Sequence, residues 1–324
     1  MRSLRNLGRI AHGAGLIARG LADRDHPLLA QIVPIRRCNI DCAYCNEYDK
    51  VSAPVPTDTM RSRIDRLADL ATEAVAFTGG EPMLHPDLDA LISHIRTRRM
   101  TPGLITNGYL LSRKRIEALN DAGLEYLQIS IDNVEPDEVS KKSLRLLDQK
   151  LQLLAEHAAF DVHINTVLGS GVKHPEDART IATRARELGL STSIGIIHDP
   201  GGHVKPLSPD ERRIWEDVNA LGNHGRWLFK NLYSGLVTFE RNLVDGRPNQ
   251  WRCRAGARYL YICEDGLVHY CSQQRGSPAI PLERYTVDDI RREYLTPKSC
   301  APYCTIGCVH RVSIMDFWRD PQHP

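Results

Sequence analysis

The chain has 324 residues, of which 42% are hydrophobic and 25% charged, as in a globular protein with one large α/β domain and room for a small appendage. A formal net charge of +2 argues against a dedicated nucleic-acid binder. No run of eighteen apolar residues exists, so no transmembrane segment is predicted.

Nine cysteines are distributed unevenly along the chain. None lies among the 207 residues between Cys45 and Cys253. An odd number of cysteines without a secretory signal argues against a disulfide scaffold, and it predicts a reducing, cytoplasmic setting in which clustered thiols bind metal. The nine are Cys38, Cys42, Cys45, Cys253, Cys263, Cys271, Cys300, Cys304 and Cys308.

The N-terminal segment, residues 1–27, is basic and amphipathic. Arginines recur through it, and apolar residues follow at roughly helical spacing. It has no long apolar stretch and no clear cleavage site, so it is not a secretory signal. We expect a helix packed on the main domain, with peripheral contact to acidic lipid as the alternative.

Short β-type runs alternate with helical segments between residues 28 and 200. Six strand–helix units predict a parallel sheet, which right-handed crossovers curl into a partial (β/α)6, TIM-like barrel with chemistry at the carboxyl ends of its strands. The predicted strands are Gln31–Ile35, Ala74–Phe77, Gly103–Thr106, Tyr126–Ile131, Val162–Val167 and Ser193–Ile197, and the predicted helices cover 57–71, 87–99, 112–122, 140–157 and 175–188.

Helix caps and an apolar stripe support these helices. Ser112 and Ser140 stand where N-cap residues are expected. The helix over 140–157 places its leucines on one stripe, which predicts core packing. These leucines are Leu144, Leu147, Leu151 and Leu154.

The pattern changes after residue 200. Residues 201–248 predict a helical connection, with helices over 208–222 and 226–245. Residues 249–324 are cysteine-rich and have little periodicity, which favours a small module held by metal. Together with 1–27 and the barrel at 28–200, this divides the chain into four regions.

Cys38, Cys42 and Cys45 follow the first predicted strand directly. Three thiolates on one loop can bind three irons of a four-iron cluster and leave the fourth iron without a protein ligand. An open metal position is where a substrate or cofactor binds. A zinc site completed by a distant ligand is the alternative for the triad alone.

The CxxxCxxC spacing, with Tyr44 before the third cysteine, resembles the signature of the radical S-adenosylmethionine superfamily. The resemblance implies that a [4Fe-4S] cluster on these cysteines binds S-adenosylmethionine and cleaves it to methionine and a 5′-deoxyadenosyl radical, which abstracts hydrogen from a substrate. It also implies that Tyr44 packs near the adenine and that an electron donor such as flavodoxin or ferredoxin reduces the cluster.

Further motifs in the predicted barrel match this family. Gly79-Gly80-Glu81-Pro82 resembles the GGEP motif, whose backbone and glutamate contact the methionine ammonium, and it follows the second strand. Polar residues at the ends of later strands are expected to bind the same cofactor. These are Asn107, Ser130, Asp132 and Asn165. A polar strand end that caps the next turn is the alternative for Ser130 and Asp132.

His198 and Asp199 end the sixth predicted strand. We expect both to face the substrate or the adenine end of the cofactor and to act in catalysis. A satisfied buried histidine is the alternative for His198.

The later cysteines resemble the opening of the auxiliary-cluster modules called SPASM and twitch. Cys253 and Cys271 are spaced as Cys-x12-Gly-x4-Cys, and Asp265-Gly266 predicts a hairpin turn between them. A full SPASM module has seven cysteines and this region has six, so we expect one auxiliary [4Fe-4S] cluster. Its expected ligands are Cys253 and Cys271 with two of Cys300, Cys304 and Cys308.

Three points about this module stay open at the sequence level. Cys263 is either a ligand or a buried apolar thiol. His310 is the alternative ligand for a second cluster. A zinc site is the rival to the cluster, since zinc ribbons use similar hairpins.

The resemblance implies an enzyme, and we expect a small-molecule substrate. Many peptide maturases of this class carry an N-terminal peptide-recognition domain, and the segment before residue 28 is too short for one. Modification of a peptide or of a lipid is the alternative. A zinc-stabilised binding module is the non-enzyme alternative.

Overall fold

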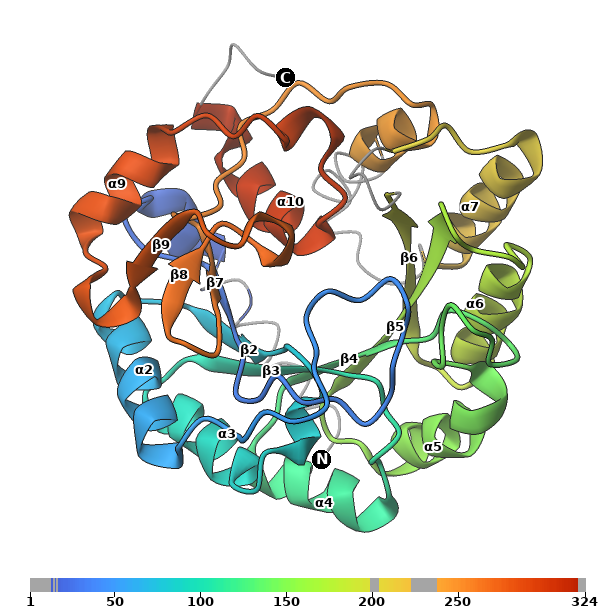
Figure 1. The fold of residues 1–324 in the computed structure, drawn as a ribbon, viewed down its shortest axis with the longest axis horizontal. Coiled ribbons are helices and arrows are strands. Elements are labelled where there is room, and N and C mark those ends of the chain that lie inside the picture. Colours follow the sequence, from blue (N-terminus) through green and yellow to red (C-terminus); the bar gives the residue numbers. More distant parts are fainter. Residues whose placement is uncertain (1–12, 14, 16, 199–203, 223–237, 320–324) are drawn as a thin grey trace.

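The computed structural model describes residues 13, 15, 17–198, 204–222 and 238–319. A nine-stranded sheet has the order β6-β5-β4-β3-β2-β1-β7-β8-β9, and every neighbouring pair from β6 to β7 is parallel. Figure 1 shows helices α2 to α6 around the outside of the curved strands. The predicted partial barrel of six strand–helix units is confirmed.

Each unit of the barrel contributes one strand and one helix. The strands are β1 (Leu29–Ile32), β2 (Ala74–Phe77), β3 (Thr101–Thr106), β4 (Tyr126–Ser130), β5 (Asp161–Gly169) and β6 (Ser191–Ile197). The helices are α2 (Thr57–Asp69), α3 (Leu88–Thr97), α4 (Arg113–Ala122), α5 (Leu144–His157), α6 (Asp177–Glu187) and α7 (Pro209–Gly222), and a short 3-10 helix, η1 (Pro82–Leu84), precedes α3.

The two faces of the barrel strands differ in chemistry. Along β4, Leu127 and Ile129 are fully buried in the core that the outer helices share. Gln128 and Ser130 alternate with them and are half-buried on the inner face. Polar residues at the inner positions reduce the apolar surface that the strand buries, but they leave hydrogen-bonding groups available inside the barrel.

Two sequence predictions concern helix α5: its buried leucine stripe and its start at Ser140. Its leucine stripe is buried as predicted, with Leu147 and Leu151 fully buried, and each such side chain contributes about 1.5–3 kcal/mol. The predicted start at Ser140 is wrong, because the helix begins at Leu144. The Ser140 hydroxyl bonds to Asp132 instead of capping the helix. Ser112 caps α4 as predicted, accepting from the Arg115 amide.

The cysteine-rich region joins the barrel sheet. β7 (Tyr259–Ile262) pairs in parallel with β1, and β8 (Leu267–His269) returns antiparallel to it, as the predicted hairpin requires. Gly266 in the turn has φ +81°, which glycine adopts without strain. Because β1 and β7 run in the same direction, the loops that follow these two strands lie at the same edge of the sheet. There the Arg36 guanidinium pairs with the Glu264 carboxylate (3.1 Å).

Short elements complete the C-terminal region. They are β9 (Pro278–Pro281), α9 (Val287–Leu295), α10 (Gly307–Ser313) and the 3-10 helices η3 (Ser272–Gln274), η4 (Leu282–Arg284), η5 (Ala301–Tyr303) and η6 (Ile314–Arg319). The helix predicted over 226–245 lies partly outside the described residues, and 238–244 are helical. Most of the N-terminal segment also lies outside them. No helix in the described part of the chain is long and apolar enough to cross a membrane.

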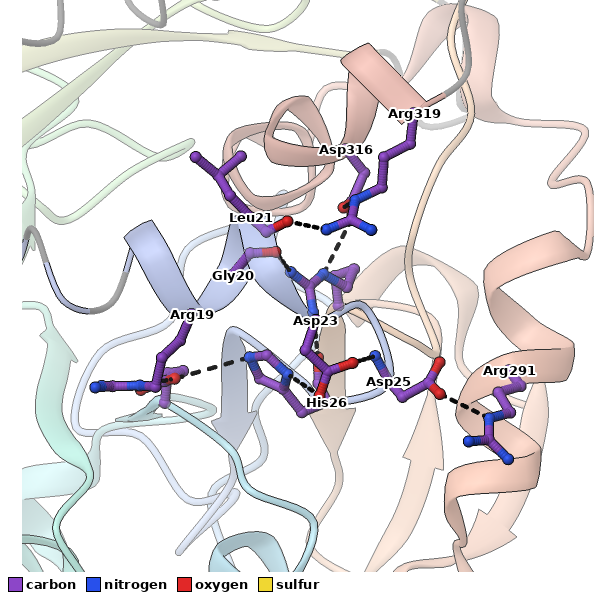
Figure 2. A network of polar contacts seen from close by, with 11 residues as sticks. Arg19, Gly20, Leu21, Asp23, Asp25, His26, Arg291, Asp316 and Arg319 are labelled. Atoms are coloured by element: carbon purple, nitrogen blue, oxygen red, sulfur yellow. Dashed lines mark hydrogen bonds and ion pairs between the residues drawn. The ribbon is translucent and has the colours of Figure 1, made fainter.

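A buried ion pair ties the two ends of the described chain to the sheet. Arg258, just before β7, lies 2.9 Å from Asp316 of η6, and both side chains are fully buried. The Arg258 guanidinium also donates to the carbonyls of Gly20 (2.6 Å) and His26 (2.7 Å). Figure 2 shows this network joining the N-terminal segment to the last helical turns, where Arg319 also approaches Asp316.

Asp316→Asn should destabilise the fold. The substitution leaves the Arg258 charge buried without its counter-ion, a change that costs about 3–5 kcal/mol. Chemical denaturation followed by circular dichroism measures it. Arg291→Met removes the exposed partner of Asp25 in the same network and should leave stability unchanged. Equal stability of both variants and the wild type would contradict the role given to the buried pair.

Candidate functional site

The first three cysteines lie in the loop between β1 and α2, at the carboxyl edge of the parallel sheet. Cys42 is buried, and Cys38 and Cys45 are partly buried. The Cys45 amide donates to the Cys42 carbonyl (3.1 Å), and the Ala43 amide donates to the Val139 carbonyl in the β4–α5 connection (2.9 Å). In Figure 1 this loop, in blue, crosses in front of the strands.

Two glycines bring the loop after β2 against the chain that leads into Cys38. The Gly80 amide donates to the Ile35 carbonyl (3.2 Å), and Gly79 has φ +112°. A Cβ on Gly80 would lie 2.2 Å from the Arg36 carbonyl oxygen. Only glycine permits this backbone approach, so the pair fixes where the cysteine loop begins.

The Glu81 carboxylate is fully buried and is bound by protein donors. Oε1 accepts from the Met83 amide (3.0 Å) and the Thr106 hydroxyl (2.8 Å), and Oε2 accepts from the Asn107 amide (2.9 Å). Burial raises its pKa, against the opposing effect of these hydrogen bonds. These hydrogen bonds from Glu81 hold the start of η1, at Pro82, next to the end of β3.

Asn107 connects the end of β3 to the cysteine loop. Its Nδ2 donates to Asn39 Oδ1 (2.7 Å) and lies 3.7 Å from Cys38 Sγ. Its Oδ1 accepts from the Tyr109 amide (3.0 Å), which fixes the orientation of the side-chain amide. Asn107 therefore presents a hydrogen-bond donor to a thiol of the triad.

Asp132, just after β4, receives three donors at one carboxylate oxygen. Its Oδ2 accepts from the Tyr44 hydroxyl (2.5 Å) and the Ser140 hydroxyl (2.7 Å), and it lies 3.1 Å from Lys142 Nζ. Ser140 Oγ also lies 3.6 Å from Cys42 Sγ. This cluster joins β4 and the following loop to the cysteine triad.

The charges in this cluster are fixed by burial and pairing. Burial opposes the charged form of Lys142, but the ion pair with Asp132 outweighs it and holds the Lys142 pKa well above its usual value. Burial also raises the pKa of the Tyr44 hydroxyl, which therefore stays protonated and donates. The second carboxylate oxygen, Asp132 Oδ1, is buried and has no hydrogen-bond partner among the described residues.

Ser130 and Asn165 are paired across β4 and β5 and are half-buried on the inner face of the barrel. Asn165 Oδ1 accepts from the Ser193 hydroxyl (3.0 Å), which in turn lies 2.6 Å from His163 Nε2. Burial, together with the charge of Arg311, lowers the pKa of His163 to about 3. His163 is therefore neutral at pH 7, and this part of the inner face is polar.

His198 follows β6 and contacts the C-terminal region. Its Nε2 lies 3.1 Å from Gln273 Oε1, an oxygen that also accepts from Asn46 Nδ2 (3.5 Å). Gln273 stands two residues after Cys271, and Asn46 follows Cys45 directly. The side-chain amide of Gln273 therefore links both cysteine regions to the end of β6. The other predicted catalytic residue, Asp199, lies outside the described residues.

Four of the later thiols are electrostatically coupled. Burial raises the pKa of Cys304 well above its usual value, and the charges of Cys253, Cys271 and Cys300 raise it further. Burial, together with the charges of Cys253 and Cys300, raises the pKa of Cys271 to about 12. The hairpin end and the loop around η5 thus bring these four thiols together.

The remaining candidate ligands have other neighbours. The Cys308 thiol lies beside the Tyr259 hydroxyl, whose own hydrogen is donated to Gln31 Oε1 (2.6 Å). Cys263 is buried in the hairpin. His310 stacks on Phe239, with ring centroids 3.4 Å apart, and burial lowers its pKa to about 3.

The donor set of the first loop fits an iron–sulfur cluster. No three His, Cys, Asp or Glu side chains within the described ranges converge as they would around a single metal ion. A cluster has a different requirement, since each thiolate binds its own iron. Burial raises the pKa of Cys38 and Cys45, so a bound metal is what would hold them as thiolates.

Sequence reasoning missed three residues of this site. Ser140 was expected to be a helix cap, and Lys142 and Gln273 were not singled out. A lysine ten positions after Asp132 carries no motif of its own. The position of Gln273, two residues after a predicted cluster ligand, is the one sequence signal that could have drawn attention to it.

Comparison with known proteins agrees with this geometry. The profile of the Radical SAM superfamily matches residues 32–203, more than half of the chain. PqqA peptide cyclase of Gluconobacter oxydans is 38% identical over 110 residues, which is 33% of this chain and 30% of that protein. GTP 3′,8-cyclase of Chlorobaculum tepidum is 30% identical over 197 residues, 57% of this chain and 55% of that protein. The chain thus spans about a third to just over half of these relatives.

Solved structures share the fold. Streptococcus suis SuiB bound to S-adenosylmethionine has a TM-score of 0.59 and 20% identity, covering 82% of this chain and 65% of SuiB. The enzyme anSMEcpe with bound AdoMet and the Cp18Cys peptide has a TM-score of 0.57 and 13% identity, covering 91% of this chain and 98% of that one.

Gly80→Ala should abolish iron binding by the first loop. The added methyl group would overlap the Arg36 carbonyl, so the segment entering Cys38 must move. Iron analysis after anaerobic reconstitution measures the loss. Gly195→Ala in β6, where the nearest atom would lie 3.8 Å away, is the matched control and should retain iron. Full iron content in Gly80→Ala would contradict the positioning role of the glycines.

Proposed function

The chain belongs to the radical SAM superfamily, whose members use a [4Fe-4S] cluster and S-adenosylmethionine. From that premise we propose that the protein removes a hydrogen atom from a peptide substrate and that a second cluster then completes the oxidation of this substrate. It is an enzyme by family. The assignment of individual residues and of the substrate belongs to the proposal.

Cys38, Cys42 and Cys45 are the proposed ligands of the first cluster. When bound, that cluster supplies the electron that cleaves S-adenosylmethionine, and the 5′-deoxyadenosyl group then takes hydrogen from the substrate. Asn107 supports Cys38 by donating toward its sulfur. The contact of Gly80 with the chain before Cys38 keeps the loop at the carboxyl edge of the sheet.

The unpartnered oxygen of Asp132 is the single observation that carries the cofactor assignment. A buried carboxylate oxygen without a donor costs free energy, and an ionised carboxylate only accepts hydrogen bonds. The ribose hydroxyls of S-adenosylmethionine are suitable donors, whereas its carboxylate is not. We therefore assign Asp132 Oδ1 to the ribose.

The remaining cofactor contacts are proposed on the same edge of the sheet. Tyr44 is oriented by its bond to Asp132 and offers its ring to the adenine. The backbone of the Gly79–Pro82 turn is assigned to the methionine ammonium, while the Glu81 carboxylate holds that turn. Ser130 and Asn165 complete the set from β4 and β5.

Cys253, Cys271, Cys300 and Cys304 are the proposed ligands of the auxiliary cluster. The electrostatic coupling among these four thiols supports this choice, and Cys308, beside Tyr259, is left out of the proposed set. The auxiliary cluster can accept the electron that a substrate radical releases on losing a proton. Gln273 links the two cluster loops, which favours communication between them.

His198 is the proposed substrate-facing residue at the barrel mouth. Gln273 Oε1 accepts from its Nε2, which leaves Nδ1 as an acceptor directed away from that bond. Asp199, the next residue, is proposed to act beside it.

The named relatives favour a peptide substrate over the small molecule expected from the sequence. PqqA peptide cyclase acts on a peptide by name, and SuiB has been solved with its precursor peptide. GTP 3′,8-cyclase, which covers more of this chain, supports a nucleotide-like small molecule as the second candidate.

Transfer of deuterium decides between these substrates. The reconstituted enzyme, with S-adenosylmethionine and a reductant, is incubated with extract of deuterium-labelled host cells separated into peptide and small-metabolite fractions. We expect deuterated 5′-deoxyadenosine with the peptide fraction and its loss after protease treatment. Deuterium transfer from the small-metabolite fraction alone would contradict the peptide proposal.

Cys304→Ala and Cys308→Ala separate the auxiliary ligands. Cys304→Ala should lower the iron content by about one cluster, about four irons, while Cys308→Ala should leave it unchanged. Iron and sulfide analysis of anaerobically reconstituted protein makes the comparison. Loss of a cluster in Cys308→Ala would contradict the assignment.

A further inference from the structure

The connection between β4 and α5 places Ser140 and Lys142 beside the cysteine loop. Both lie within the Asp132 cluster, and neither has a role in the contacts proposed for the cofactor. Ser140 is 2% exposed, and the Lys142 side chain is 15% exposed. Polar groups so deeply placed next to a triad of thiols act on whatever charge the triad holds.

The Ser140 hydroxyl has one hydrogen and two acceptors within reach. It accepts from the Lys142 amide (3.2 Å) and, as placed, donates its hydrogen to Asp132 Oδ2 at 2.7 Å, with Cys42 Sγ 3.6 Å away. Asp132 Oδ2 already has the Tyr44 hydroxyl and the Lys142 ammonium. A thiolate at Cys42 has no hydrogen and can only accept. Rotation of the Ser140 hydroxyl from Asp132 Oδ2 to the sulfur would supply that donor and leave Asp132 Oδ2 with its other two.

The Lys142 ammonium is a fixed positive charge at the same place. It lies 3.1 Å from Asp132 Oδ2 and 5.0 Å from the centre of the Tyr44 ring. Burial raises the pKa of the Cys45 thiol, and the positive charge of Lys142 opposes that rise. Lys142 and Asp132 form an ion pair, so loss of the lysine alone leaves an uncompensated carboxylate beside the triad.

We propose that Ser140 and Lys142 are positioning residues that raise the reduction potential of the first cluster, Ser140 through a hydrogen bond to the Cys42 sulfur and Lys142 through its charge. The inference rests on the proposed assignment of Cys42 as a cluster ligand. Reduction adds one electron from the external donor and no proton, so the site gains one negative charge. Donors to the ligand sulfurs and nearby cations stabilise that added charge and raise the potential.

A redox titration followed by electron paramagnetic resonance tests this in the full-length holoenzyme. The signal of the first cluster is the one that changes when S-adenosylmethionine is added, and a signal that does not respond serves as internal reference. We expect Ser140→Ala and Lys142→Met to lower the midpoint potential of the responsive cluster. The reference signal should keep its potential.

Conservative variants of the same residues, and one variant of a neighbouring residue, distinguish an effect on the reduction potential from general damage to the fold. Ser140→Thr and Lys142→Arg keep the hydroxyl and the charge and should restore the wild-type potential. Lys141→Met removes a charge from the same segment, but its ammonium bonds to the Asp137 carbonyl (2.9 Å) instead of to Asp132, so the potential should not move.

Two results overturn different parts of the inference. An unchanged potential in both Ser140→Ala and Lys142→Met, with the cluster present, refutes the tuning role and leaves the proposed function intact. A responsive signal that survives in Cys42→Ala refutes the ligand assignment itself. If Ser140→Ala fails to hold the cluster, Lys142→Met alone decides, because its side chain lies outside the cysteine loop.

Discussion

The carboxylate of Asp132 is the contact on which the organisation of the site depends. It is buried at the end of β4 and binds one side chain from the cysteine loop, Tyr44, and two from the β4–α5 connection. A buried carboxylate needs donors, and here the donors come from segments far apart in sequence. Satisfying one oxygen of Asp132 therefore aligns the loop of thiols, and the other oxygen has no hydrogen-bond partner among the described residues.

Continuity of the sheet explains how a second set of thiols comes near the first. Parallel pairing of β1 with β7 places the turn after β7 beside the loop after β1, where Arg36 meets Glu264. Gln273 then spans the gap from the Cys271 loop to Asn46 and His198. The two cysteine regions are thus parts of one sheet-based unit, held at its far side by the Arg258–Asp316 pair.

The sequence predicted what depends on local pattern. Strand–helix alternation, the leucine stripe of α5 and the Asp265-Gly266 hairpin are properties of short segments, and all three are observed. The pairing of β7 with β1 was not predictable, because it joins segments more than two hundred residues apart. Ser140 was expected to cap a helix, and its contact with Asp132 outweighed that local preference.

Within the site, too, local patterns were predictable and contacts between distant segments were not. Cys38, Cys42 and Cys45 were found because their spacing is itself a chemical pattern. Lys142 was missed because its role depends on a buried partner that only the folded chain provides. The proposed choice of Cys304 over Cys308 likewise depends on which thiols act on one another in the folded chain, and spacing does not encode that.

The central claim is that Asp132 and the cysteine loop form one binding site for S-adenosylmethionine. Binding of the cofactor to reconstituted wild-type protein and to Asp132→Asn, each holding its first cluster, tests it most directly. Isothermal titration should show binding to the wild type and at least about tenfold weaker binding to the variant, which corresponds to about 1.4 kcal/mol. Equal affinity in both proteins would contradict the claim.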